Sequence, residues 1–98
     1  VLACDLRIAA PGAKIFYPVM KLGFLPQPSD PGRLSALVGP ARAKLVLIGG
    51  AKVTAGEALA MGLVDRVDDD PLAEARVIAA DAMEADRTHV EAIKDMLS

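Results

Sequence analysis

Residues 16–26 read Phe-Tyr-Pro-Val-Met-Lys-Leu-Gly-Phe-Leu-Pro, and this stretch marks the point where a strand gives way to a loop. Residues 14–17 are predicted to be extended, because Ile15 and Phe16 favour β-structure. Residues 18–32 then contain four prolines and two glycines. These residue types interrupt helices and strands, so the segment is predicted to be a loop, and loops carry functional residues more often than core elements do.

The residues on the N-terminal side predict another short strand. Leu6–Ala10 is expected to be extended and to stop at the turn-forming pair Pro11-Gly12. Val1 begins in the middle of a pattern and no initiator methionine is present, so further sequence is expected upstream. Asp5 and Arg7 interrupt the apolar start too early for the core of a signal peptide.

On the C-terminal side, apolar residues recur at helical spacing. Asp30 followed by Pro31 predicts a helix start, with Asp30 as the N-cap and Pro31 at the first helical position. The stripe that follows is predicted to break into two helices at Gly39-Pro40 and to end at Gly49-Gly50. Its apolar members are Leu34, Leu37, Val38, Ala41, Leu45 and Ile48.

Three helical segments and one extended segment are predicted for the rest of the chain. Thr54–Glu57 fits a capping box at the start of a short helix, and Gly62 is the matching stop. Residues 63–67 are expected to be extended, and the three aspartates at 68–70 to turn into the next helix. The apolar stripe of that helix is Leu72, Ala75, Ile78, Ala79, Ala82 and Met83. A last amphipathic segment carries Val90, Ile93 and Leu97.

The composition argues against several classes of protein. The chain has 98 residues and a formal net charge of −2, and its lysines and arginines are scattered, so no nucleic-acid partner is expected. No apolar run reaches membrane-spanning length, so no membrane partner is expected either. The single cysteine, Cys4, fits a reducing compartment, and a cytoplasmic location is expected. Cys4 is expected to be a buried thiol, and His89 a surface side chain.

Four stretches resemble, in order and with matching gaps, the signatures of the crotonase (enoyl-CoA hydratase/isomerase) family. Residues 2–9 are similar to the strand that follows the first catalytic helix of that family. Residues 16–26 resemble its F-x-x-P-E-x-x-L-G-x-x-P stretch, give or take one residue at the start. Residues 34–44 resemble its L-x-x-L-V-G-x-A-x-A-K helix pair, and residues 55–67 its A-x-E-A-x-x-x-G-L-V-x-x-V signature.

This resemblance implies an α/β fold of the crotonase type, the β-β-α superhelix shared by ClpP and crotonase. The chain would be a partial crotonase-like domain over residues 1–98. Residues 1–33 would supply the last strands and the active-site loop, and residues 34–98 the helical C-terminal portion.

The resemblance also implies a chemistry. Family enzymes hold the thioester carbonyl of an acyl-CoA in an oxyanion hole of two backbone N–H groups, which stabilise the charge that develops there. Both donors lie upstream of Val1 in the family pattern. Hydration further uses two glutamates as general acid and base. The first would lie a couple of residues before Val1, and the second is replaced here by Val19, which carries no proton.

The family pattern therefore gives substrate-binding candidates and no firm catalytic residue. Pro18, Val19, Leu22 and Gly23 are expected to line the acyl pocket, with Val19 as an apolar wall where an acid normally stands. Asp30 is the only acid of the altered loop and is a candidate relocated acid, although the N-cap role is favoured. Tyr17 and Lys21 could touch a polar acyl group, but a packing ring and a solvated charge are the favoured interpretations.

Two functions remain open at this point. The first is an enzyme of the enoyl-CoA hydratase/isomerase family, a lyase or isomerase of fatty acid metabolism that processes an acyl-CoA thioester. The alternative is a catalytically degenerate member with a binding or assembly role, because Val19 replaces the glutamate. The 98 residues alone are expected to be inactive. No cofactor is expected beyond the coenzyme A of the substrate, no metal is expected, and the family resemblance implies a homotrimer or dimer of trimers.

Overall fold

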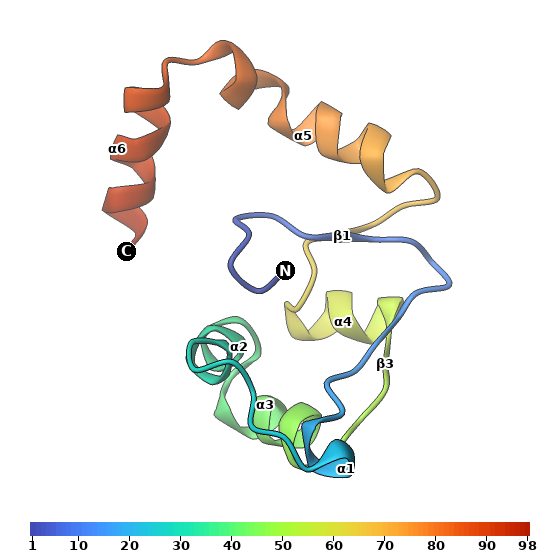
Figure 1. Ribbon diagram of the computed structural model, residues 1–98. Coiled ribbons are helices and arrows are strands. Elements are labelled where there is room, and N and C mark those ends of the chain that lie inside the picture. The colour runs from blue at the N-terminus through green and yellow to red at the C-terminus, as the bar shows by residue number, and fades with distance from the viewer.

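The computed structural model describes residues 1–98 as a mixed α/β chain with six helices and four strands (Figure 1). The helices are α1 (Val19–Leu22), α2 (Asp30–Val38), α3 (Pro40–Leu47), α4 (Ala55–Met61), α5 (Pro71–Glu84) and α6 (Arg87–Leu97). The strands are β1 (Ile8–Ala9), β2 (Lys14–Ile15), β3 (Val53–Thr54) and β4 (Arg66–Val67). Helices α1 to α4 and the strands form one body, and α5 and α6 arch away from it.

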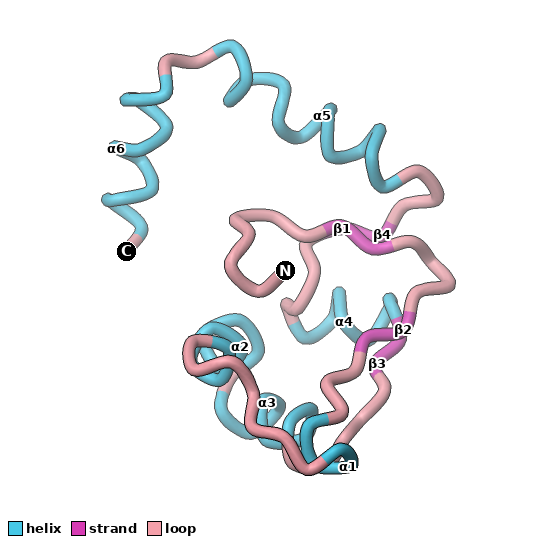
Figure 2. Tube along the Cα trace, viewed as in Figure 1, coloured by secondary structure: helices cyan, strands magenta, loops and turns pink.

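The strands pair between segments that are distant in sequence (Figure 2). β1 pairs in parallel with β4, so that Ile8 lies opposite Arg66. β2 pairs antiparallel with β3, so that Ile15 lies opposite Val53. The extended segments predicted around residues 6–10, 14–17 and 63–67 each contain one of these short strands, whereas β3 was not predicted.

Ten buried hydrophobic residues form the main core between the strands and the helices α2, α3 and α4. They are Ala9, Leu34, Val38, Ala43, Val46, Val53, Ala55, Ala58, Leu63 and Val64. The predicted helix break is confirmed, because Gly39 has a φ of 87° between α2 and α3. The single apolar stripe across this break is wrong: Val46 is buried in α3, whereas Leu45 is exposed. A new helix starts at Pro40 in a new direction, so the phase of α2 does not continue.

Arg7 is the one buried charged residue and connects the N-terminal segment to the residues between α4 and β4. Its Nε donates to the carbonyl oxygen of Leu63 at 2.9 Å, and its Nη1 donates to the carbonyl oxygen of Cys4. The backbone N–H of Arg7 donates to Asp65 Oδ2 at 2.8 Å, and the N–H of Asp65 returns a bond to the carbonyl of Arg7 at 2.8 Å. The guanidinium therefore donates to two backbone carbonyls, Leu63 and Cys4, which are partners that a buried charge requires.

The short helix α4 has the termini that the sequence predicts. Thr54 Oγ1 accepts the backbone N–H of Glu57 at 3.2 Å and donates to Glu57 Oε1 at 3.0 Å, which is a capping-box pairing. Gly62 ends the helix with a φ of 85°, the left-handed conformation that glycine adopts at low cost.

Helices α5 and α6 bury no residue. Leu72 is 62% exposed and Met83 is 73% exposed, so the apolar stripe predicted for α5 faces solvent over much of its length. Lys94 in α6 forms a 2.8 Å ion pair with Asp5, which ties the last helix back to the N-terminal segment. No helix of the chain has both the length and the apolar character needed to cross a membrane.

The expectation that Cys4 is a buried thiol is wrong, because Cys4 is exposed. Its N–H donates to the carbonyl of Val1 at 3.0 Å, and in this turn only Leu2 packs against the core. His89, by contrast, is exposed on α6 as predicted.

Replacing Gly62 with alanine is expected to lower the free energy of unfolding by about 1–2 kcal/mol, the cost of a left-handed residue with a Cβ. That Cβ would also lie 3.1 Å from the carbonyl oxygen of Leu37. Gly56→Ala is the matched control, because Gly56 lies inside α4 with open space around its Cβ. Urea unfolding of both variants checks this, and equal stabilities for the two variants would contradict it.

Replacing Arg7 with alanine is expected to cost about 3 kcal/mol of stability, because the carbonyl of Leu63 and the carboxylate of Asp65 both lose a partner. Arg66→Ala is the control: Arg66 is exposed, and its side chain bonds only to the carbonyl of its neighbour Asp65. That control should change stability by no more than about 0.5 kcal/mol. Thermal or urea unfolding measures both, and a small effect at Arg7 would show that the network is dispensable.

Candidate functional site

The loop of residues 18–29 leaves β2, forms the single turn of α1 and enters α2. Val19 is only 8% exposed, whereas Leu22 is 59% exposed. Gly23 ends α1 with a φ of 72°, and Phe24 donates its N–H to the carbonyl of Val19 at 3.0 Å. The loop therefore folds back on itself around a buried Val19.

Two side chains that flank this loop meet directly. The Tyr17 hydroxyl donates to Asp30 Oδ2 at 2.6 Å and accepts the backbone N–H of Gln27 at 3.3 Å. Asp30 is the first residue of α2, Ser29 is the N-cap, and no side chain caps this helix. The favoured N-cap role of Asp30 is therefore wrong, because the carboxylate bonds to Tyr17 and not to the N–H groups of the first turn.

The hydrogen bond to Asp30 raises the pKa of Tyr17 above its ordinary value of 10.0, since it holds the proton on the phenol. The N–H of Gln27 acts in the opposite direction, because it stabilises the phenolate, but its effect on the pKa is smaller. At neutral pH the Tyr17 hydroxyl therefore keeps its proton and donates it in a hydrogen bond to Asp30.

A cavity of about 340 Å³ lies beside this pair and is mostly apolar. Its nine hydrophobic lining residues are Val1, Leu2, Ile15, Phe16, Tyr17, Leu34, Val46, Leu63 and Val64. Arg7 and Asp30 are the two charged residues of its wall. The guanidinium of Arg7 is bonded to backbone carbonyls. Asp30 is the only acid in the cavity lining.

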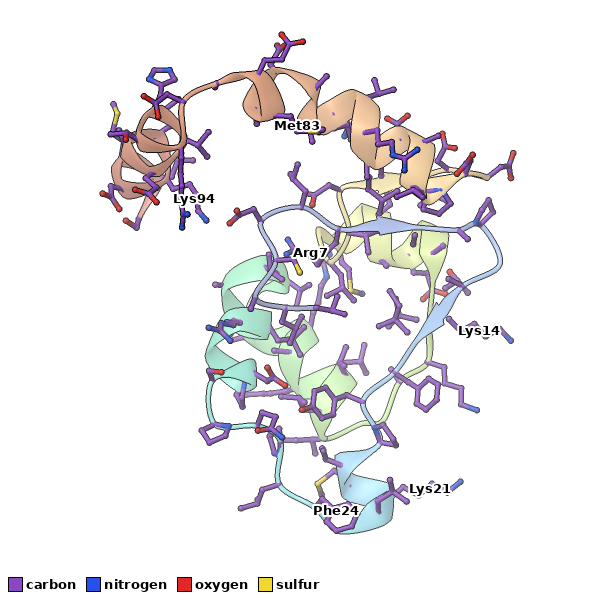
Figure 3. The ribbon with its side chains drawn as sticks, turned by 45° about the horizontal axis from the view of Figure 1, so that its top comes forward. Arg7, Lys14, Lys21, Phe24, Met83 and Lys94 are labelled. Atoms are coloured by element: carbon purple, nitrogen blue, oxygen red, sulfur yellow. The ribbon has the colours of Figure 1, made fainter.

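The structure brings some of the sequence candidates to this cavity and leaves others elsewhere. Asp30 and Tyr17 line it, whereas Pro18, Val19, Leu22 and Gly23 do not. Lys21 and Phe24 project from the α1 end of the molecule, well apart from Arg7 (Figure 3). The acyl-pocket assignment of Pro18, Val19, Leu22 and Gly23 therefore stays a prediction.

The aspartates at 68–70 serve the start of α5. Asp70 is the N-cap and accepts the N–H of Ala73 at 3.2 Å, while Asp68 Oδ1 accepts the N–H of Asp70 at 2.9 Å. This is the turn-and-cap arrangement expected of three adjacent aspartates before a helix.

Comparison with known proteins identifies the family. The sequence pattern of the enoyl-CoA hydratase/isomerase family matches residues 1–98. The chain belongs to this family. It is 41% identical, over 95% of its length, to a short-chain-enoyl-CoA hydratase of Clostridioides difficile.

Solved structures confirm the crotonase-type fold. The chain superposes with a TM-score of 0.88 on an enoyl-CoA hydratase/isomerase family protein from Hyphomonas neptunium, at 40% identity over 98% of the chain. It superposes with a TM-score of 0.85 on an enoyl-CoA hydratase from Thermoplasma volcanium, at 33% identity over 98% of the chain.

The chain spans only part of these relatives. It covers 64% of the Clostridioides difficile protein and 37% and 38% of the two solved chains. The chain thus corresponds to part of a crotonase-type domain.

Sequence reasoning missed two features of the site. The pairing of Tyr17 with Asp30 was not predicted, although a phenol and a lone acid at the two ends of a proline-rich loop were a usable signal. Arg7 was not singled out as a site residue, although an arginine between Leu6 and Ile8 in a predicted strand signals a buried charge that needs partners.

Tyr17 is the only tyrosine among the 98 residues, so the absorbance of phenolate reports its ionisation alone. Its titration midpoint is expected above 10, and Asp30→Asn should lower it. Because the folded-state pKa is the raised one, this hydrogen bond stabilises the fold below about pH 10 and is lost as the pH rises through the folded-state value. An identical midpoint in the Asp30→Asn variant would contradict the pairing.

Proposed function

We propose that the protein containing this chain is an enzyme that processes an acyl-CoA thioester. The match of the family pattern over all 98 residues carries this proposal. Within the chain, the loop of residues 18–29 would supply part of the acyl pocket, with Pro18, Val19, Leu22 and Gly23 in its wall. Coenzyme A would enter as part of the substrate, with no separate cofactor.

The residue at position 19 restricts the reaction. Valine can neither take nor give a proton, so a hydration that needs a general acid–base pair at positions 19 and upstream is not supported. A reaction that needs only stabilisation of an enolate-like charge by backbone N–H donors remains compatible with the chain. Those donors lie outside residues 1–98 in the family pattern, and residues 1–98 alone would be inactive.

A second candidate is a catalytically degenerate member with a binding or assembly role. Val19 at the family position of the glutamate favours it, and the exposed apolar residues of α5 and α6 offer a surface for assembly. These include Leu72, Val77, Met83, Met96 and Leu97. Their exposure fits a contact with a neighbouring subunit in a trimer or dimer of trimers, and the whole assembly would act in the cytoplasm.

Restoring the acid separates the two candidates. In the full-length protein, and only if the upstream glutamate of the family pattern is present, Val19→Glu is expected to raise the hydration rate of crotonyl-CoA by up to about 100-fold, the low end of what a positioned acid or base contributes. Val19→Gln is the matched control, because the glutamine side chain has the shape of glutamate but does not act as an acid or base. Steady-state kinetics measures the rates, and isothermal titration with an acyl-CoA measures binding.

Three outcomes are informative. A gain in Val19→Glu alone supports an intact acyl-CoA site with a missing acid. Binding of acyl-CoA without turnover in any variant favours the degenerate member. Absence of both binding and turnover in correctly folded full-length protein rejects the acyl-CoA proposal.

A further inference from the structure

The Tyr17 hydroxyl is the point where the two ends of the loop are joined. It donates to Asp30 at the far end of the loop at 2.6 Å and accepts the N–H of Gln27 at 3.3 Å. The N–H of Asp30 in turn donates to the carbonyl of Gln27 at 3.0 Å. Three hydrogen bonds thus close a ring across the base of the loop.

The rest of the loop makes only local hydrogen bonds. Val19 bonds to the carbonyl of Tyr17, Leu22 to that of Pro18, and Phe24 to that of Val19. These bonds shape the turn of α1, but they do not hold it against the body of the molecule. Val19 is buried, yet it does not belong to the main core cluster.

The prolines of the loop make the Tyr17–Asp30 bond, called the brace below, more effective in ordering the loop. The loop and its exit contain prolines at 18, 26, 28 and 31, which restrict the unfolded chain and lower the entropy lost on ordering. The same prolines have no N–H, so they cannot supply backbone bonds of their own. A side-chain brace at the base is therefore the means that this loop has for fixing its ends.

We infer that Tyr17 and Asp30 are positioning residues, whose hydrogen bond sets the conformation of residues 18–29 and so the position of Val19. The inference rests on the proposed function only where it concerns the binding of an acyl group by residues 18–29. It assigns Asp30 a role that differs from the relocated catalytic acid. A positioning role needs a hydrogen-bond acceptor at residue 30, whereas a catalytic role needs a titratable group.

Asparagine at position 30 distinguishes the two roles, because its side-chain oxygen accepts the Tyr17 hydroxyl but cannot exchange a proton. Tyr17→Phe and Asp30→Ala both remove the bond. Ser29→Ala is the matched control, since it removes only an exposed hydrogen bond from Arg33 Nη1 at the same helix start, 3.0 Å long.

The first measurement is amide hydrogen exchange of the full-length protein, which requires no activity. Exchange of residues 19–25 is expected to accelerate by about fivefold in Tyr17→Phe and Asp30→Ala, the factor for losing one hydrogen bond. It should stay near wild type in Asp30→Asn and Ser29→Ala. Exchange in α4 is the internal reference: if Tyr17→Phe also loosens α4, the comparison of Asp30→Ala with Asp30→Asn decides.

The second measurement is the steady-state kinetics of the full-length protein on crotonyl-CoA. A positioning role predicts that Tyr17→Phe and Asp30→Ala raise KM several-fold with a smaller change in kcat, and that Asp30→Asn largely restores KM. A loss of kcat by orders of magnitude in Asp30→Asn, with Tyr17→Phe active, would overturn the inference and make Asp30 the relocated acid.

The two proposals fail separately. Unchanged exchange of residues 19–25 in both Tyr17→Phe and Asp30→Ala overturns the brace, whatever the enzyme does. If exchange accelerates in Tyr17→Phe and Asp30→Ala as expected, but the full-length protein binds no acyl-CoA, the proposed function is rejected. The Tyr17–Asp30 hydrogen bond then keeps a purely structural role.

Discussion

The buried guanidinium of Arg7 needs hydrogen-bond partners within a small apolar core. The arrangement of the chain depends on which groups supply them. A buried charge without partners costs several kcal/mol, so the groups around it are fixed in place. The carbonyls of Cys4 and Leu63 accept from Arg7, and Asp65 bonds to both its backbone and its side chain. These bonds draw the residues after α4 against the N-terminal segment, and the pairing of β4 with β1 begins at the next residue of each segment, Arg66 and Ile8.

That arrangement leaves β2 and β3 on the other side of α4, and the residues after β2 become the loop that carries Val19. Short strands of two residues have little stability of their own. They persist here because Val53, Ala55 and Ala58 are buried against Leu34 and Val46 in the same core. The position of β2, which leads into the loop, is thus set by packing on the helices more than by the sheet.

The cavity beside the loop has one acid in its lining, Asp30, and this acid is already hydrogen-bonded. Val19 is apolar, and the carboxylate of Asp30 accepts the hydroxyl of Tyr17 beside a mostly apolar cavity. The one acid of the cavity lining therefore already has a structural partner in Tyr17.

Local signals in the sequence determined where several of the helices begin and end. The break at Gly39, the cap at Thr54 and the stop at Gly62 depend on backbone conformations and bonds within three or four residues, so the sequence alone predicted them. The sequence alone also shows valine at position 19, where the family pattern that it resembles has glutamate. Only the tertiary structure decided the rest: the bonds of Arg7 span 56 and 58 residues, and the Tyr17–Asp30 bond spans 13. Partners at such separations are chosen by how the whole core packs, because no local propensity distinguishes one distant carbonyl or carboxylate from another.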